Sequence, residues 1–133
     1  FGAQALFYVI TNRVGQDGFM SWPQIQEMAA YGMTFGSHTL DHVDLTETAL
    51  SAERMKEELA KSKKTIEEHL GRPVTDFCYP SGQYNDVAVA AVKSAGYLSA
   101  TTVVGKAVQN GDNWLTLPRI RMEEPTDLAK LFK

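Results

Sequence analysis

The sequence predicts an α/β domain with a parallel sheet, because short apolar runs alternate with helical patterns along its 133 residues. The runs that are typical of buried strands span residues 5–10, 33–37, 74–79, 97–104 and 115–122. A strand followed by a helix and another strand favours βαβ units, whose strands run parallel. Pro118 interrupts the last run, so we expect a bend there.

Two shorter helices are delimited by residues that begin and end helices. Ser21 is a good N-cap for the first, and Gly32 is placed to end it. Asn85 or Asp86 caps the other, which Gly96 closes. A further short helix is expected at the end of the chain, beginning at Thr126 or Asp127.

The longest helix is expected from Ser51, its N-cap, to about Leu70. Its apolar side carries Met55, Leu59, Ile66 and Leu70 at helical spacing. The opposite side is charged, and we interpret it as a solvated face without a function. It comprises Glu57, Glu58, Lys61, Lys63, Lys64 and Glu67.

Composition excludes several classes of function. The chain is 44% hydrophobic, which is normal for a globular core, and it is long enough for one domain or part of one. Its net charge of −3 gives no basic footprint for nucleic acid. No apolar run approaches the roughly 18 residues of a membrane span. Cys78 is the single cysteine, so an internal disulfide is excluded.

Two of the three histidines, His38 and His42, directly follow the second apolar run. Neutral imidazole is the commonest metal ligand among side chains, and a catalytic zinc site takes about three protein ligands and an open position. The pair therefore predicts part of a metal site. The alternative is two hydrogen-bonded polar residues, because this spacing alone is a weak signal. We interpret His69, in the last turn of the long helix, as structural.

Several candidate residues follow strands. His38 and His42 follow the second run, Tyr79 and Pro80 follow the third, and another loop follows Val104. Sites of parallel α/β folds lie at the C-terminal ends of the strands. We therefore expect these residues to share one edge of the sheet.

The stretch 38–42, His-Thr-Leu-Asp-His, resembles the His-Ser/Thr-x-x-His motif of the polysaccharide deacetylases. These are the NodB-homology or carbohydrate esterase family 4 enzymes. Segments 18–22, 32–36 and 77–82 resemble the same family, and the resemblance extends from about Ala5 to Met122. It implies a distorted, parallel-stranded (β/α) barrel, incomplete here because only five strands are expected. We expect residues 1–133 to form a single catalytic domain that is truncated at its N-terminus.

The resemblance implies a hydrolase that removes N-acetyl groups from N-acetylglucosamine-containing polysaccharide, such as peptidoglycan, poly-N-acetylglucosamine or chitin-like polymers. His38 and His42 would bind the divalent metal, with Zn²⁺ the first choice. The family's third ligand and its catalytic base come from a Thr-Phe-Asp-Asp-Gly motif, which these residues do not contain. Asp41 lies between the histidines, but we expect it to point elsewhere. The family's setting implies an extracellular or cell-envelope protein.

Residues 78–82 stand where the family has Arg-Phe/Tyr-Pro-x-Gly. The resemblance implies that the backbone N–H of Tyr79 donates to the oxyanion, and that Tyr79 and Pro80 contact substrate. A simple turn at the end of a strand is the alternative. Cys78 replaces the family arginine, and Arg119 is a candidate to replace its guanidinium. The alternative for Arg119 is an ion pair with Glu123 or Glu124.

Trp114 is a candidate for stacking on a sugar ring, although a tryptophan near a strand start is more often part of the core. No histidine follows His69, so the general acid has no candidate. Two other functions stay open. One is a non-catalytic carbohydrate-binding module derived from this fold, and the other is a structural α/β domain whose histidines are incidental.

Overall fold

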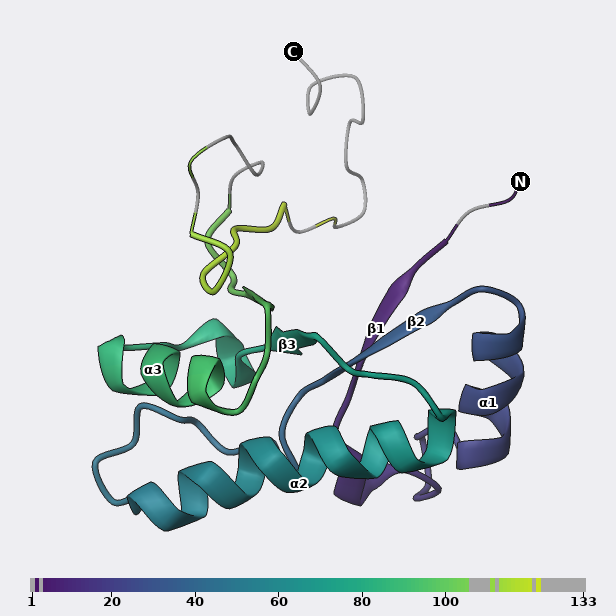
Figure 1. Cartoon of the computed structure of the whole chain (residues 1–133), viewed down its shortest axis with the longest axis horizontal. Helices are drawn as coiled ribbons and strands as arrows, with labels where there is room; N and C mark the ends of the chain where they lie inside the picture. The colour runs from purple at the N-terminus through teal and green to yellow at the C-terminus, as the bar shows by residue number, and fades with distance from the viewer. Residues whose placement is uncertain (1, 3, 106–110, 112, 121, 123–133) are drawn as a thin grey trace.

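The computed structural model describes residues 2, 4–105, 111, 113–120 and 122, and it contains a four-stranded sheet (Figure 1). All neighbouring strands are parallel, in the order β1-β2-β3-β4. The strands are β1 (Leu6–Val9), β2 (Thr34–Ser37), β3 (Asp76–Cys78) and β4 (Ser99–Thr101). The predicted parallel α/β architecture is therefore confirmed.

Three α-helices connect these strands: α1 (Trp22–Ala30), α2 (Ala52–Leu70) and α3 (Asp86–Ser94). Figure 1 shows α2 between α1 and α3, and α2 also contacts β2. The predicted caps are present, because the side chains of Ser51 and Asn85 accept backbone N–H bonds at the starts of α2 and α3. Short 3₁₀ turns follow β1 (η1, Thr11–Arg13) and β3 (η2, Pro80–Gly82).

The core lies between the sheet and the helices. Its fully buried side chains include Ile25, Leu59, Ile66, Phe77 and Val92. These come from α1, α2, β3 and α3, so each helix contributes an apolar side, as its spacing predicts. The helices thereby cover the sheet and leave the C-terminal ends of its strands accessible.

Gly36 brings β2 and β3 unusually close together. A Cβ at this position would lie 2.6 Å from the carbonyl oxygen of Asp76 and 2.8 Å from the ring of Tyr8. Any larger residue would therefore clash with backbone, and glycine is required here. The missing side chain also leaves room for the Tyr8 ring beside the end of β2.

The predicted fifth strand, residues 115–122, is wrong for the part of it that the structure describes. Only a single bridge joins Thr101 to Leu117, whose N–H donates to the carbonyl of Ala100. The regular register ends after Leu117, because the N–H of Arg119 donates to the carbonyl of Val104 and not to that of Thr102. The third and fourth strands are also shorter than predicted. The helix predicted at Thr126 or Asp127 lies outside the described residues.

The charged side of α2 is not uniformly solvated, contrary to the prediction. The side chain of Glu58 is fully buried, with 0% of its surface exposed. Lys63 is largely buried too, and its Nζ donates to the carbonyl of Val74. Periodicity places residues on a helix face but does not reveal that a loop covers part of that face. Among the described residues, none of the helices is long and apolar enough to cross a membrane.

Candidate functional site

A cleft of about 630 Å³ lies at the C-terminal ends of β2 and β3. Residues from five segments of the chain line it: Tyr8, His38, His42, Cys78, Tyr79, Ser81, Gly82, Val103 and Arg119. The structure thus brings together four of the predicted site residues, namely His38, His42, Tyr79 and Arg119. The volume of the cleft lies within the range of about 300–1,000 Å³ that is typical of small-molecule sites.

The two histidine rings face each other edge to face, with centroids 4.7 Å apart and an interplanar angle of 78°. His38 is tied to the sheet, because its N–H donates to the carbonyl of Val9 at 2.9 Å. Its ring Nδ1 lies 2.6 Å from the carbonyl oxygen of Cys78. A carbonyl only accepts, so Nδ1 carries the proton and Nε2 keeps its lone pair. This arrangement is typical of a metal-binding histidine.

Electrostatics keep His38 neutral. Burial lowers the pKa of His38 below its ordinary value, and the nearby His42 and Arg119 lower it further, against the opposing hydrogen bond to the Cys78 carbonyl. Neutral imidazole is the form that binds metals. The surroundings of His38 therefore favour ligation over protonation.

The loop between the histidines has an unusual backbone. Thr39 and His42 both have positive φ, at 66° and 61°. This region costs a residue with a side chain about 1–2 kcal/mol. The side chain of Thr39 supports the turn, since its Oγ1 donates to the carbonyl of His38 and accepts the N–H of His42 at 2.9 Å. The threonine of the motif therefore shapes the loop.

The backbone N–H of Tyr79 does not fit the oxyanion role that was predicted for it. It donates to the carbonyl of Thr101 at 3.1 Å, as part of the pairing between β3 and β4. The phenol is buried and donates to the carbonyl of Leu115 at 3.0 Å. Burial raises the pKa of Tyr79, and the neighbouring Tyr84 raises it further, so the phenol stays protonated. Tyr79 therefore contributes to the wall of the cleft.

Ser81 is the residue of this turn that sequence reasoning missed. Its φ is 54°, and it lines the cleft. The N–H groups of Gly82 and Gln83 donate back to Tyr79 and Pro80, whereas within the described part of the chain the backbone bonds include none from Ser81. Proline has no N–H. The N–H of Ser81 is therefore the first in this turn that stays available to a ligand. The sequence could have shown this, because Ser81 directly follows Pro80, which has no N–H.

Arg119 lines the cleft, and its Nε donates to the carbonyl of Thr102 at 2.8 Å. This bond holds the base of the guanidinium at the rim. The alternative partners, Glu123 and Glu124, lie outside the described residues. Pro80 is buried beside the cleft.

Trp114 is not among the residues that line the cleft. Its side chain is 69% exposed, so the alternative that places it in the core is wrong. Its role in binding substrate stays a prediction.

Other acidic and imidazole groups lie away from the histidine pair. Asp41 accepts from Asn12 at 2.7 Å and from Arg54 at 2.5 Å, so it is held on the other side of the loop. His69 stacks on Trp22, with ring centroids 3.8 Å apart. The described residues contain no cluster of three His, Cys, Asp or Glu side chains that could hold a metal ion. His38 and His42 fit two positions of a metal site.

Comparison with known proteins identifies the class to which this fold and cleft correspond. The model of the polysaccharide deacetylase family matches residues 1–100. The chain therefore belongs to the polysaccharide deacetylase family, the NodB-homology or carbohydrate esterase family 4 group.

Individual relatives agree with this assignment. The solved structure of the Streptococcus pyogenes deacetylase PplD, in complex with acetate, superposes with a TM-score of 0.93 at 27% identity, over 99% of this chain and 60% of PplD. A Bacillus anthracis structure, the polysaccharide deacetylase homologue BA0330, has a TM-score of 0.85 at 32% identity, over 96% of this chain and 41% of BA0330. YxkH of Bacillus subtilis (strain 168), named after the same family, is 29% identical over 122 residues.

The chain covers only part of these relatives. The match to YxkH covers 92% of this chain but only 43% of YxkH. The match to PplD covers 60% of PplD. The parallel sheet matches these structures, so the predicted fold is confirmed, with the described residues forming an incomplete barrel. The prediction that residues 1–133 are an N-terminally truncated catalytic domain stays a prediction.

Proposed function

We propose that the protein is a metal-dependent hydrolase that removes N-acetyl groups from an N-acetylglucosamine-containing polysaccharide. The observation that carries the proposal is the pair of imidazoles in the cleft, 4.7 Å apart, with Nδ1 of His38 fixed on a backbone carbonyl. Family membership and the deacetylase PplD support the reaction class. Such polymers belong to the cell surface, so the proposal includes an extracellular or cell-envelope location.

His38 and His42 would hold the divalent metal, for which Zn²⁺ is our first choice because it accepts imidazole nitrogen readily. When bound, such a metal polarises a carbonyl oxygen and makes water a better nucleophile near neutral pH. His38 stays neutral through burial, and the Cys78 carbonyl fixes its tautomer. His38 is therefore already neutral and in the correct tautomer before a metal binds.

The other cleft residues have roles in binding and charge stabilisation. The N–H of Ser81 would donate to the amide oxygen as negative charge develops there, as in an oxyanion hole. Arg119 would orient a carboxylate, because a guanidinium matches carboxylate geometry. Tyr79 and Pro80 would shape the wall against which the sugar packs. Trp114, exposed outside the cleft, would contact the polymer further along.

The test is acetate release from N-acetylglucosamine oligomers by the full-length protein, with and without a chelator. We expect release that the chelator abolishes and added Zn²⁺ restores. Release that persists unchanged after chelation would contradict metal dependence. Binding of the oligomer without any release would favour the non-catalytic carbohydrate-binding alternative.

A further inference from the structure

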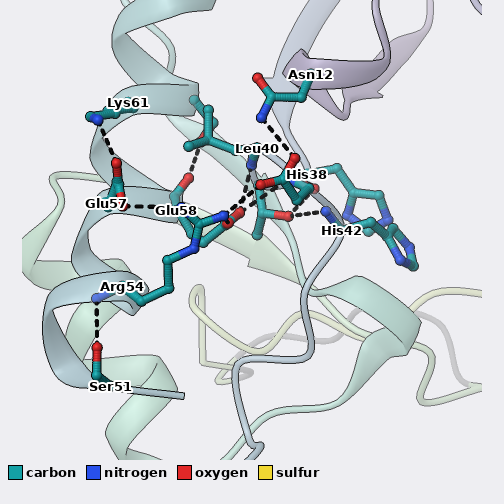
Figure 2. A network of polar contacts seen from close by, with 12 residues as sticks. Asn12, His38, Leu40, His42, Ser51, Arg54, Glu57, Glu58 and Lys61 are labelled. Atoms are coloured by element: carbon teal, nitrogen blue, oxygen red, sulfur yellow. Dashed lines mark hydrogen bonds and ion pairs between the residues drawn. The ribbon is translucent and has the colours of Figure 1, made fainter. Parts of the chain in front are cut away.

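The loop between the two histidines is held in place by a side chain of α2. Glu58 points from this helix toward the loop (Figure 2), and its Oε2 accepts the N–H of Leu40 at 2.9 Å and of Asp41 at 3.1 Å. Two consecutive N–H groups thus converge on one carboxylate oxygen. Such a concave pair of N–H groups is a typical anion-binding arrangement, and the positive φ of Thr39 opens it.

The opposite side of the loop is fixed to η1. The carbonyls of Thr39 and Leu40 accept N–H bonds from Thr11 and Asn12, at 3.3 and 3.0 Å. The N–H groups of Leu40 and Asp41 therefore depend on Glu58, and the carbonyls of Thr39 and Leu40 depend on η1. Glu58 holds the backbone of the loop through its side chain, so this support can be removed without changing the backbone.

The negative charge of Glu58 is balanced by an arginine of the same helix. Arg54, one turn earlier on α2, places Nη2 2.6 Å from Oε1 of Glu58 as an ion pair, while directing its hydrogen bond to Oδ2 of Asp41 at 2.5 Å. The guanidinium thus joins the helix carboxylate to the loop. A buried charge persists only when it is paired and hydrogen-bonded, and this one is both.

We propose that Glu58 is a positioning residue for the metal site: by binding the N–H groups of Leu40 and Asp41, it fixes the relative orientation of the His38 and His42 rings. Glu58 lies behind the loop and does not line the cleft, so it acts through the histidines and is not a ligand. This inference rests on the proposed function, in which those histidines hold a metal.

Glu57 offers a matched control on the same helix. It pairs with Arg54 at 3.0 Å and with Lys61, but its hydrogen bonds do not reach the loop. Glu57→Gln removes the same charge as Glu58→Gln. Glutamine at 58 keeps the shape of the side chain but loses the ion pair and leaves a weaker acceptor for the two N–H groups.

The experiment is a calorimetric titration of Zn²⁺ into the metal-free, full-length protein. Loss of a residue that orients metal ligands typically weakens affinity about 10–100-fold, and we expect Glu58→Gln to fall in this range. Glu57→Gln should stay within about twofold of wild type, because exposed ion pairs contribute little. The visible spectrum of the Co²⁺-loaded protein should change in Glu58→Gln and not in Glu57→Gln. A residue that only stabilises the fold would lower the melting temperature and leave both readouts unchanged.

Equal zinc affinity and equal Co²⁺ spectra in Glu58→Gln and wild type would overturn this role and leave the proposed function intact. Absence of zinc binding by the wild type would overturn the proposed function itself. If Glu58→Gln does not fold, amide hydrogen exchange in the wild type decides. Slow exchange at Leu40 and Asp41, comparable to that of the middle of α2, supports the role. Exchange at both amides as fast as in an exposed loop overturns it.

Discussion

The two loops that face each other across the cleft are stabilised in different ways. In the histidine loop, residues 38–42, two non-glycine residues have positive φ, and the N–H groups of Leu40 and Asp41 bind Glu58, at least 17 positions further along the chain. In the proline turn, residues 79–83, Ser81 and Gly82 have positive φ, and the N–H groups of Gly82 and Gln83 bond within the turn. One loop depends on a distant side chain and the other on its own residues.

This difference separates two kinds of sensitivity. Substitution of Glu58 should change the geometry of the histidines, whereas the proline turn should respond to changes in its own residues and in Val103, which packs on it. The cleft is therefore built from one wall that is fixed by long-range contacts and another that is fixed locally. The predictions below test that distinction, from the largest expected effect to the smallest.

The largest effect is expected at the histidine loop itself. His38→Gln should lower acetate release by at least about 100-fold, because it removes a ligand and not merely the support of one. His69→Gln is the control, since His69 stacks on Trp22 at the far end of α2. Rates should be compared in the full-length protein with saturating Zn²⁺. Equal losses in the two variants would remove the special role of the loop.

The next effect concerns the proline turn. Gly82→Ala should lower the free energy of unfolding by about 2 kcal/mol, because the new Cβ combines strained backbone with overpacking. That Cβ would lie 2.4–2.8 Å from side-chain carbons of Val103, at a φ of 69°.

Gly71→Ala is the matched control, with a φ of 64° and no atom within 4 Å of the new Cβ. It should lose only about 1 kcal/mol, the cost of the left-handed backbone alone. Urea unfolding measures both, and adding Val103→Ala should recover part of the loss in Gly82→Ala. A double variant no more stable than Gly82→Ala would show that the contact with Val103 is unimportant.

The smallest effect separates stability from metal affinity. Ser51→Ala and Asn85→Ala each remove an N-cap, so each should lower stability by about 1 kcal/mol. Neither residue touches the histidine loop, so zinc affinity should match wild type in both. A parallel loss of affinity would mean that the site follows global stability and that the distinction between the two walls is wrong.

Local signals in the sequence were sufficient for most of the fold. The caps Ser51 and Asn85 and the apolar spacing along α2 located the helices, because these features act over a few residues. The strand predicted at 115–122 was wrong because apolar composition does not show that the register with β4 is lost after Leu117.

Most of the site was predictable because its residues follow strands. His38, His42 and Tyr79 are brought to one edge by parallel topology, which alternating elements already indicate. Glu58 could not be found, because a glutamate on a charged helix face resembles its solvated neighbours Glu57 and Lys61. Glu58 is buried because the histidine loop lies against the helix at this position. The spacing of residues along the sequence does not reveal such a contact. The hydrogen bond that occupies the Tyr79 N–H likewise depends on strand pairing.

The central claim is that His38 and His42 bind the same metal ion. Zinc K-edge X-ray absorption of the zinc-loaded, full-length protein tests this most directly. We predict at least two imidazole nitrogens at about 2.0–2.1 Å from the metal, with one fewer in His42→Gln. A first coordination shell that is unchanged by His42→Gln would contradict the claim.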